Sequence, residues 1–510
     1  DGGVMTMSSG VPTAVVTVTG AGTWRLNGLT IQAGGTFTAD AATITMDGGW
    51  TSTTTNVSFA IGTSTVIFAA SGTATMGDTD AIGDGTYDFY SLTVNAGVTT
   101  TLGRNPTNIA IRAVFTINGT WTAPNGVTQL TAVAGLGTQD PIVVSGTTDL
   151  SGSGQLELVN LNSSGASLSQ HVPSTTYQYL ALEGIAGTEI RFTGNITTTS
   201  CGVDANCAFL VRTYYSFSLQ TPTSFNVYTD NFNLTVGGVF WIGDGSGDGT
   251  GVGGTMWLGA STVTSNGMAP NGRGILHAQT ATITVSPSST YTPVALYMSS
   301  AIGSSFLYAE QSTIVVSGGF KTFNAGDVVD FATSAWTVTG AWLNITTNAS
   351  WDAGSGTVTF NGGAALTMTF AGALLAENEF NNVTFNDSAA MTYTMATRGL
   401  RLGGTLSITD TVTTVALATS NLAITAGAVS IGTNGTLTAG SSTITTNGSG
   451  AVWISTSGTF TPGTSVVAIT TTGTVAMDET FFSMTTTAGI TVTFTQNVTF
   501  TGTFTANSAI

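Results

Sequence analysis

A short phrase recurs along this chain: glycine, threonine, an aromatic residue or leucine, threonine, and then alanine or proline. Clear copies lie at residues 35–39, 119–123, 435–439, 458–462 and 502–506, and a looser copy lies at 349–353. Self-similarity of this kind is typical of stacked repeats, in which each unit buries its apolar face only against its neighbours. The repetition therefore predicts a solenoid and argues against a compact enzyme.

A second phrase begins with phenylalanine and continues as a strand, at residues 89–94, 380–385 and 481–486, with a weaker relative at 177–182. Near the C-terminus the first phrase begins at Gly404 and returns at Gly435, Gly458 and Gly502. The steps are 31, 23 and 44 residues, and 44 is twice 22. A period near 22 to 25 residues suits one turn of a parallel β-helix, with three short strands and their corners. The sequence thus predicts an all-β fold, a right-handed parallel β-helix with loop insertions.

The strand patterns alternate between threonine and large apolar residues, as in residues 356–360 and 442–445. Such alternation sends every second side chain into the interior. Glycine and asparagine between the strands suit corners that need positive φ. Tandem β-sandwich domains are the alternative, because Asn-Gly at 434–435 and 447–448 also suits hairpin turns.

The regularity of the repeats divides the chain into three sections. Residues 1–159 and 346–510 carry the repeated phrases and are expected to form regular solenoid. Residues 160–345 are less regular and hold both cysteines and a glycine-rich stretch at 243–254. We expect the same solenoid there with larger loops, since repeat proteins place variation and binding in loops.

The charge balance narrows the partners. Only 7% of the 510 residues are charged, and the net charge is −17. Nucleic acid is not an expected partner, because phosphate binding needs clustered lysine and arginine. The chain also lacks a stretch of about 18 apolar residues, so no transmembrane segment is expected.

Two acidic clusters are candidate calcium sites. One comprises Asp78, Asp80, Asp84 and Asp88, and the other comprises Asp244 and Asp248 in a glycine-rich loop. Calcium prefers carboxylate and carbonyl oxygens in flexible loops. The alternative is a plain turn in which aspartate favours the corner. Ca²⁺ is the one cofactor that the sequence suggests.

The two cysteines, Cys201 and Cys207, have a spacing that suits a small loop closed by a disulfide. Two buried free thiols are the alternative. Zinc is not favoured, because the histidines, His171 and His277, are distant in the sequence. A disulfide would indicate an oxidising compartment.

Carboxylates precede the phenylalanine phrase at Asp88, Glu379 and Glu479, and Glu377 lies just before Glu379 on the same predicted strand face. Paired carboxylates can perform acid–base chemistry on glycosides. A catalytic pair occurs once, however, whereas corner residues recur, so a role at the corners of the turns is favoured. His171 and His277 are interpreted as structural, because no nucleophile motif accompanies them.

The pattern Asn-x-Ser/Thr, the acceptor of N-linked glycans, is frequent. Candidate glycosylation sites are Asn56, Asn118, Asn162, Asn195, Asn233, Asn344, Asn348, Asn382, Asn386, Asn434, Asn447 and Asn497. Many such patterns arise by chance in a chain rich in threonine, serine and asparagine. Glycosylation at some of them would suit an exported protein.

These phrases, above all Gly-Thr-Phe-Thr-Ala, Ser-Thr-Ile-Thr and Phe-Tyr-Ser-Leu-Thr-Val-Asn, resemble the large repetitive surface proteins that bacteria and archaea secrete. The resemblance extends broadly to autotransporter passengers, haemagglutinin-type adhesins and surface-layer proteins. It covers both ends of the chain well and the middle poorly. It implies a right-handed β-helix at the cell surface with adhesive or wall-building roles, and it supplies no catalytic residue.

Three functions follow as hypotheses. The first is a secreted structural protein, located outside the cell or on its surface, that assembles with copies of itself into a filament, sheath or surface layer. Its open terminal strands are expected to stack end to end. The second is an adhesin that binds glycans through the aromatic residues Trp241, Trp257, Tyr214 and Tyr215. The third, an enzyme acting on polysaccharides, is not favoured, because the arginines are scattered along the sequence.

Overall fold

The structure is a computed structural model of the chain. The described residues are 4–7, 15–32, 36–52, 59–60, 62–75, 89–102, 108–122, 127–132, 140–145, 150–160, 169–185, 187–199, 209–213, 225–243, 253–287, 294–298, 304–322, 326–344, 351–362, 366–370, 379–387, 389–410, 414–476 and 478–507. They form strands and corners and no helix. Two compact units divide the chain, unit 1 at Asp1–Ser265 and unit 2 at Asn266–Ile510.

Unit 1 is a β-solenoid whose successive turns pair in parallel. One turn contributes β4 (Gly28–Ile31), β5 (Thr36–Ala39) and β6 (Thr43–Met46). The next turn contributes β7 (Trp50–Ser52), β8 (Phe59–Ala60) and β9 (Thr65–Phe68). Each strand pairs in parallel with its counterpart in the next turn. These turns therefore have the three strands that the sequence predicted.

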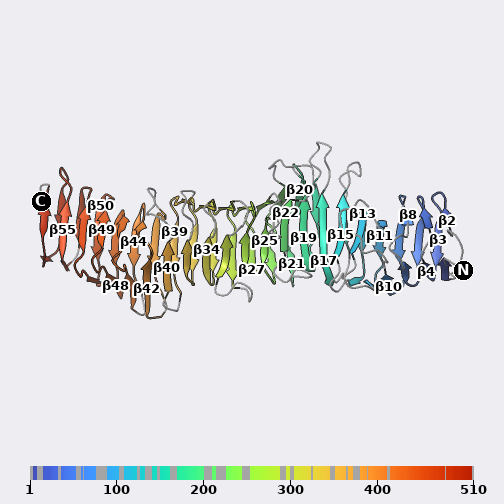
Figure 1. Ribbon diagram of the computed structural model, residues 1–510, viewed down its shortest axis with the longest axis horizontal. Coiled ribbons are helices and arrows are strands. Elements are labelled where there is room, and N and C mark those ends of the chain that lie inside the picture. The colour runs from blue at the N-terminus through green and yellow to red at the C-terminus, as the bar shows by residue number, and fades with distance from the viewer. Residues whose placement is uncertain are drawn as a thin grey trace. The chain divides into compact units, whose positions relative to one another are not determined.

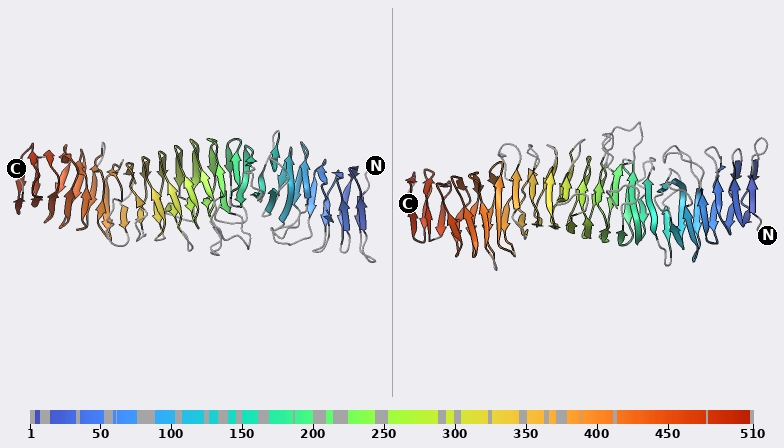
Figure 2. Two further views of the ribbon diagram at one scale, coloured as in Figure 1. Left: turned by 90° about the horizontal axis from the view of Figure 1, so that it is seen from above. Right: turned by 60° about the horizontal axis from the view of Figure 1, so that its bottom comes forward.

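Unit 2 repeats this arrangement. The strands β42 (Met391–Ala396), β43 (Leu400–Arg401) and β44 (Thr405–Ile408) form one turn. They pair in parallel with the strands of the following turn, which are β45 (Val415–Ala418), β46 (Ile424–Ala426) and β47 (Ala428–Ile431). Within this unit the strands lie side by side in sequence order, from yellow to red in Figure 1 and in both views of Figure 2.

Parallel pairing decides between the two predicted architectures. The β-helix is confirmed, and the tandem β-sandwich is wrong, because sandwiches are built from antiparallel strands. The length of a turn is not constant along the chain. Thr443 pairs with Val466, and Val466 pairs with Ser483, so the second of these two turns is the shorter one.

Alternate side chains fill the interior in rows that run from turn to turn. In one row of unit 1, Ile44, Val66, Leu92 and Phe115 align in register and are all fully buried. Burying a side chain of this size contributes roughly 1.5–3 kcal/mol. The residues that flank each of them on its own strand, such as Thr43 and Thr45 beside Ile44, face outward. The Thr-apolar-Thr pattern thus specifies one buried and one outward row per strand position.

The repeated first phrase supplies one of these strands. Its central residue is buried in β5, in β14 (Thr120–Thr122) and in β48 (Gly435–Thr438), as Phe37, Trp121 and Leu437 respectively. The same holds for Phe460 in β51 (Thr459–Thr461). In these four copies the phrase places one large apolar side chain in the core between two threonines, whereas Phe504 of the copy at 502–506, in β58 (Phe504–Ala506), is partly exposed.

Tight corners connect the strands and explain their glycine and serine. After β48, the backbone N–H of Ser442 donates to the carbonyl of Ala439 at 3.0 Å, and Gly440 between them has φ +58°. The amide oxygen of Asn421, from the preceding turn, accepts the backbone N–H of Ser441 at 2.8 Å. Side-chain amides therefore join consecutive corners.

The three predicted sections and the two compact units divide the chain differently. Described strands of the middle section keep the parallel stacking, for example β18 (Ser169–Val172), β20 (Glu189–Phe192) and β23 (Asn226–Tyr228). They support the expectation that the solenoid continues there. The described residues also contain no helix of the length and apolar character needed to cross a membrane.

Candidate functional site: outward rows of charged and of neutral side chains

The outward side chains of four neighbouring strands in unit 1 form a row of charged and aromatic groups. The strands are β18, β20, β23 and β26 (Thr255–Trp257), which stack in register. The register aligns His171, Arg191, Tyr228 and Trp257. We call these four residues the charged row. It is notable in a chain with so few ionisable residues.

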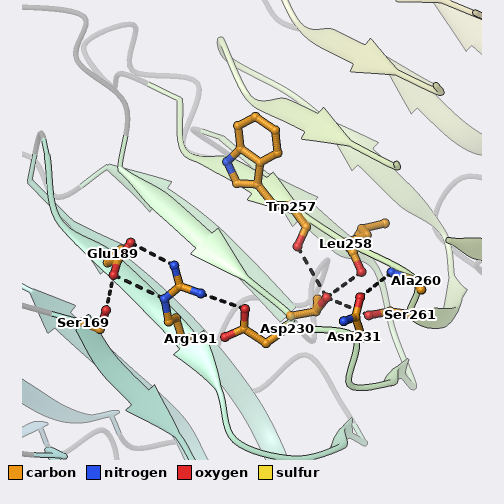
Figure 3. A network of polar contacts seen from close by, with 10 residues as sticks. Ser169, Glu189, Arg191, Asp230, Asn231, Trp257, Leu258, Ala260 and Ser261 are labelled. Atoms are coloured by element: carbon orange, nitrogen blue, oxygen red, sulfur yellow. Dashed lines mark hydrogen bonds and ion pairs between the residues drawn. The ribbon is translucent and has the colours of Figure 1, made fainter. Parts of the chain in front are cut away.

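Ion pairs hold the centre of the charged row. The guanidinium of Arg191 contacts Glu189 (Nε–Oε1 3.3 Å) and Asp230 (Nη1–Oδ1 2.8 Å), as Figure 3 shows. The Ser169 hydroxyl donates to Glu189 on the neighbouring strand. Burial opposes ionisation of Glu189, but the hydrogen bonds from Ser169 and Arg191 outweigh it and lower the pKa of its carboxyl. The hydrogen bond to Glu189 raises the pKa of Arg191.

The planar groups of this row stack on one another. The Arg191 Cζ lies 4.4 Å from the ring centroid of Tyr228. On the next strand, the Trp257 ring is nearly parallel to Tyr228, at 13° and 6.1 Å between centroids. The Trp257 indole N–H donates to the Asn226 side chain at 3.1 Å. The faces of the Tyr228 and Trp257 rings are thus in contact with side chains of neighbouring turns. These cation–π and stacked pairs stabilise the stacking of the turns.

A corner beside the row is held by side-chain hydrogen bonds. Asp230 and Asn231 both adopt positive φ, 50° and 68°. The Asn231 amide oxygen accepts the backbone N–H of Ala260 at 2.7 Å (Figure 3). The Thr229 hydroxyl donates to the carbonyl of Leu258 at 2.6 Å. These bonds fix the position of Asp230, and thereby of its partner Arg191.

Unit 2 has a row of similar chemistry on β29 (Ile275–His277), β32 (Phe306–Tyr308), β35 (Val328–Asp330) and β38 (Trp351–Asp352). The His277 ring stacks on Tyr308 at 4.7 Å and 12°, and its Nδ1 lies 3.0 Å from Glu310. Asp330 and Asp352 align in register. Burial, with smaller contributions from Asp352 and Glu310, raises the pKa of the Asp330 carboxyl.

A different surface of unit 2 carries no charge. It comprises the outward side chains of β30 (Thr282–Ser286), β33 (Thr313–Val316), β36 (Ala335–Val338), β39 (Thr357–Phe360), β41 (Asn382–Phe385), β44 and β47. None of these seven strands contains an ionisable residue. We call this surface the threonine face. Its outward side chains are threonine, serine, alanine, valine and one asparagine, all partly or fully exposed.

Two carboxylates that precede the phenylalanine phrase lie at ends of strands or beside them. Glu379 is fully buried and pairs with Arg398, whose side chain is 5% exposed. The backbone N–H of Glu379 donates to the carbonyl of Arg401 in the next turn. Glu479 begins β54 (Glu479–Phe481), where the Ser455 hydroxyl donates to it at 3.5 Å. Asp88 and Glu377 lie outside the described residues.

The predicted calcium and disulfide residues also lie outside the described part of the chain. These are Asp78, Asp80, Asp84, Asp88, Asp244 and Asp248, together with Cys201 and Cys207. They stay predictions. Among the residues that the structure describes, no three histidine, cysteine, aspartate or glutamate side chains come together as a metal site.

Several candidate glycosylation asparagines make hydrogen bonds between turns. The side-chain oxygens of Asn195 and Asn382 accept backbone N–H groups of Asn233 and Thr405, and that of Asn233 accepts the N–H of Thr262, each at 2.9 Å. Asn447 and Asn497 are exposed. Asn56, Asn162 and Asn348, and the side chain of Asn344, lie outside the described residues.

Both histidines lie on outward strand positions against a carboxylate. The His171 Nδ1 is 2.6 Å from Asp140, and His277 contacts Glu310 as described above. The predicted role in glycan binding is wrong for Trp241, which is only 8% exposed because all of β25 (Phe240–Ile242) is buried. Trp257 is partly exposed, whereas Tyr214 and Tyr215 lie outside the described residues.

Comparisons with known proteins give no relative. No family model, no curated protein and no solved structure matches this chain.

Proposed function

We propose that this chain is an extracellular structural protein that assembles with copies of itself into a filament, sheath or surface layer. The proposal assigns it no catalytic role. It follows from the regular β-solenoid and from the distribution of charge over its surface.

One observation carries the proposal: charge is absent from a long run of outward strand positions. With a net charge of −17, identical chains repel one another in solution. The ionisable groups that the structure describes are often paired, as in Arg25–Asp47 and Arg191–Glu189, or buried, as are Asp387 and Asp410. The threonine face is neutral. Depletion of charge is a mark of surfaces that become the centre of an interface.

Features of the sequence support the proposed location outside the cell. The spacing of Cys201 and Cys207 suits a disulfide, and exposed asparagines such as Asn447 and Asn497 lie in glycosylation patterns. Both modifications belong to exported proteins. The resemblance to repetitive surface proteins points the same way.

Electron microscopy of the purified protein, with calcium and with a chelator, tests the proposal. Regular filaments or sheets are expected. Loss of order in chelator would assign calcium to the assembly and direct attention to the two aspartate clusters. Dispersed single particles in both conditions, at concentrations up to the solubility limit, would contradict self-assembly.

A second candidate function is glycan binding by the charged row, favoured by the partly exposed Trp257, whose indole N–H donates to Asn226 and which Tyr228 separates from Arg191. Aromatic edges beside planar hydrogen-bonding groups suit sugar hydroxyls and C–H groups. Because Tyr228 has Arg191 and Trp257 stacked beside it, such a ligand would rely on hydrogen bonds more than on ring stacking. Binding of the soluble protein to a glycan array, lost in Trp257→Ala, would support this function. An array without signal would contradict it.

A further inference from the structure

The threonine face is a lattice set by strand register. Thr337, Thr359 and Thr384 align in one outward row, and Ser407 and Ser430 extend it. A second outward row, displaced along each strand by one further outward position, contains Thr357, Asn382 and Thr405 among others. Neighbouring members of a row are about 4.8 Å apart, and the two rows are about 7 Å apart.

The face is bound firmly to the rest of the solenoid. Below it, Val358, Val383 and Leu406 are buried, and the Asn382 side chain accepts the backbone N–H of Thr405 at 2.9 Å. The lattice of hydroxyl and methyl groups is therefore a rigid surface whose order does not depend on a ligand.

Two properties of this surface identify its occupant. First, a chain of net charge −17 can approach its own copy closely only where neither copy presents charge, and the threonine face meets that condition. Second, side chains that repeat every ~4.8 Å interdigitate with a partner of the same period. Another copy of this solenoid has the same period, because its strands have the same spacing. We propose that the threonine face is the surface through which two copies of this chain pack against each other.

The same surface on both copies makes the contact isologous, so that one two-fold operation relates them and the contact joins two copies. A filament, sheath or layer then needs a second contact elsewhere on the chain. Seven strands span about 29 Å, which with two outward rows gives a few hundred Å² per copy. A standard specific interface buries about 800 Å² per partner. A single contact is therefore weak, and assembly depends on concentration. The outward side chains of the threonine face include no aromatic residue, leucine, isoleucine or methionine, so packing of threonine rows supplies the contact.

This inference rests on the proposed self-assembly and is tested by placing charge on the face. The variant Thr337→Glu/Thr384→Glu puts two carboxylates in one row, two turns apart. The matched control, Thr392→Glu/Thr436→Glu, makes the same change two turns apart in another outward row, on the separate run of paired strands β42, β45 and β48. All four threonines face outward. The two variants carry the same net charge and the same loss of strand propensity.

Sedimentation velocity over a hundredfold range of concentration reads out association, and circular dichroism verifies that each variant is folded. We expect wild type and control to associate, and the face variant to need at least tenfold higher concentration or to stay monomeric. If the face variant associates like the control, the threonine face is not the contact surface, although the protein still self-assembles. If wild type is monomeric throughout, the proposed function itself fails.

Discussion

The buried pair Glu379–Arg398 makes an unusual prediction about pH. Glu379 has no exposed surface, and burial, which disfavours the charged form, outweighs the attraction of Arg398 and raises the pKa of its carboxyl to about 7. In the unfolded chain the pKa of a glutamate is about 4.3. Between these values the folded state binds the proton that the unfolded state has lost. The free energy of unfolding must therefore fall as pH rises from about 4.5 to about 7.

The magnitude follows from the size of the shift. Each pKa unit corresponds to about 1.4 kcal/mol, so a shift of about 2.7 units makes the loss reach about 4 kcal/mol, nearly all of it by about pH 8. Glu379→Gln mimics the neutral carboxyl at every pH. We expect this variant to match wild type at about pH 3.5, to exceed it by about 1 kcal/mol at pH 5 and by up to about 4 kcal/mol at pH 8.

The assay is denaturant unfolding of both proteins at several pH values, because the difference between them cancels every other titrating group, including Glu479. Since a solenoid can unfold in stages, the transition that reports unit 2 should be followed. Removing one partner of an ionised, attractive buried pair costs about 3–5 kcal/mol. If Glu379→Gln is less stable than wild type by that amount at pH 8, the ionised pair stabilises the folded state there, so burial does not raise the pKa of Glu379 and the reasoning is refuted.

Three further predictions concern the solenoid itself. Ile444→Ala removes a fully buried side chain from β49 (Thr443–Thr446) and should cost about 2–5 kcal/mol in unfolding measurements, whereas Thr445→Ala, on its outward side, should stay within about 0.5 kcal/mol. Gly440→Val should destabilise strongly, because φ is +58° and a Cβ would lie 2.3 Å from the Asn421 side chain. Gly450→Asn should be tolerated, since φ of +81° suits asparagine better than other residues and no atom lies within 4 Å of its Cβ position. Equal thermal midpoints for Ile444→Ala and Thr445→Ala, or for the two glycine variants, would contradict these assignments.

Much of the fold could be predicted from local pattern. The phrase around Leu437 contains the alternation that buries this leucine, and the following Gly440 and Ser442 specify the corner. Repetition of these local signals also predicted stacking, because a short strand with one apolar face needs a neighbour to cover it. The threonines of the outward rows were visible in the sequence as the polar half of the same alternation.

The long-range partners could not be predicted, because they depend on the length of each turn. The register brings His171, Arg191, Tyr228 and Trp257 together, yet their separation along the chain changes at every step. No fixed period in the sequence therefore marks them as neighbours. Arginines that look scattered along the chain, such as Arg191, are brought to carboxylates by the register. Glu379 was predicted as a corner residue, but its partner Arg398 lies in the next turn, beyond any local motif.

Cryo-electron microscopy of the assembled protein tests the central claim most directly. The account predicts parallel β-solenoids packed side by side, with Thr337, Thr359 and Thr384 of one copy against the same residues of another. An assembly held together through the row of His277 and Tyr308, with the threonine face open to solvent, would contradict it.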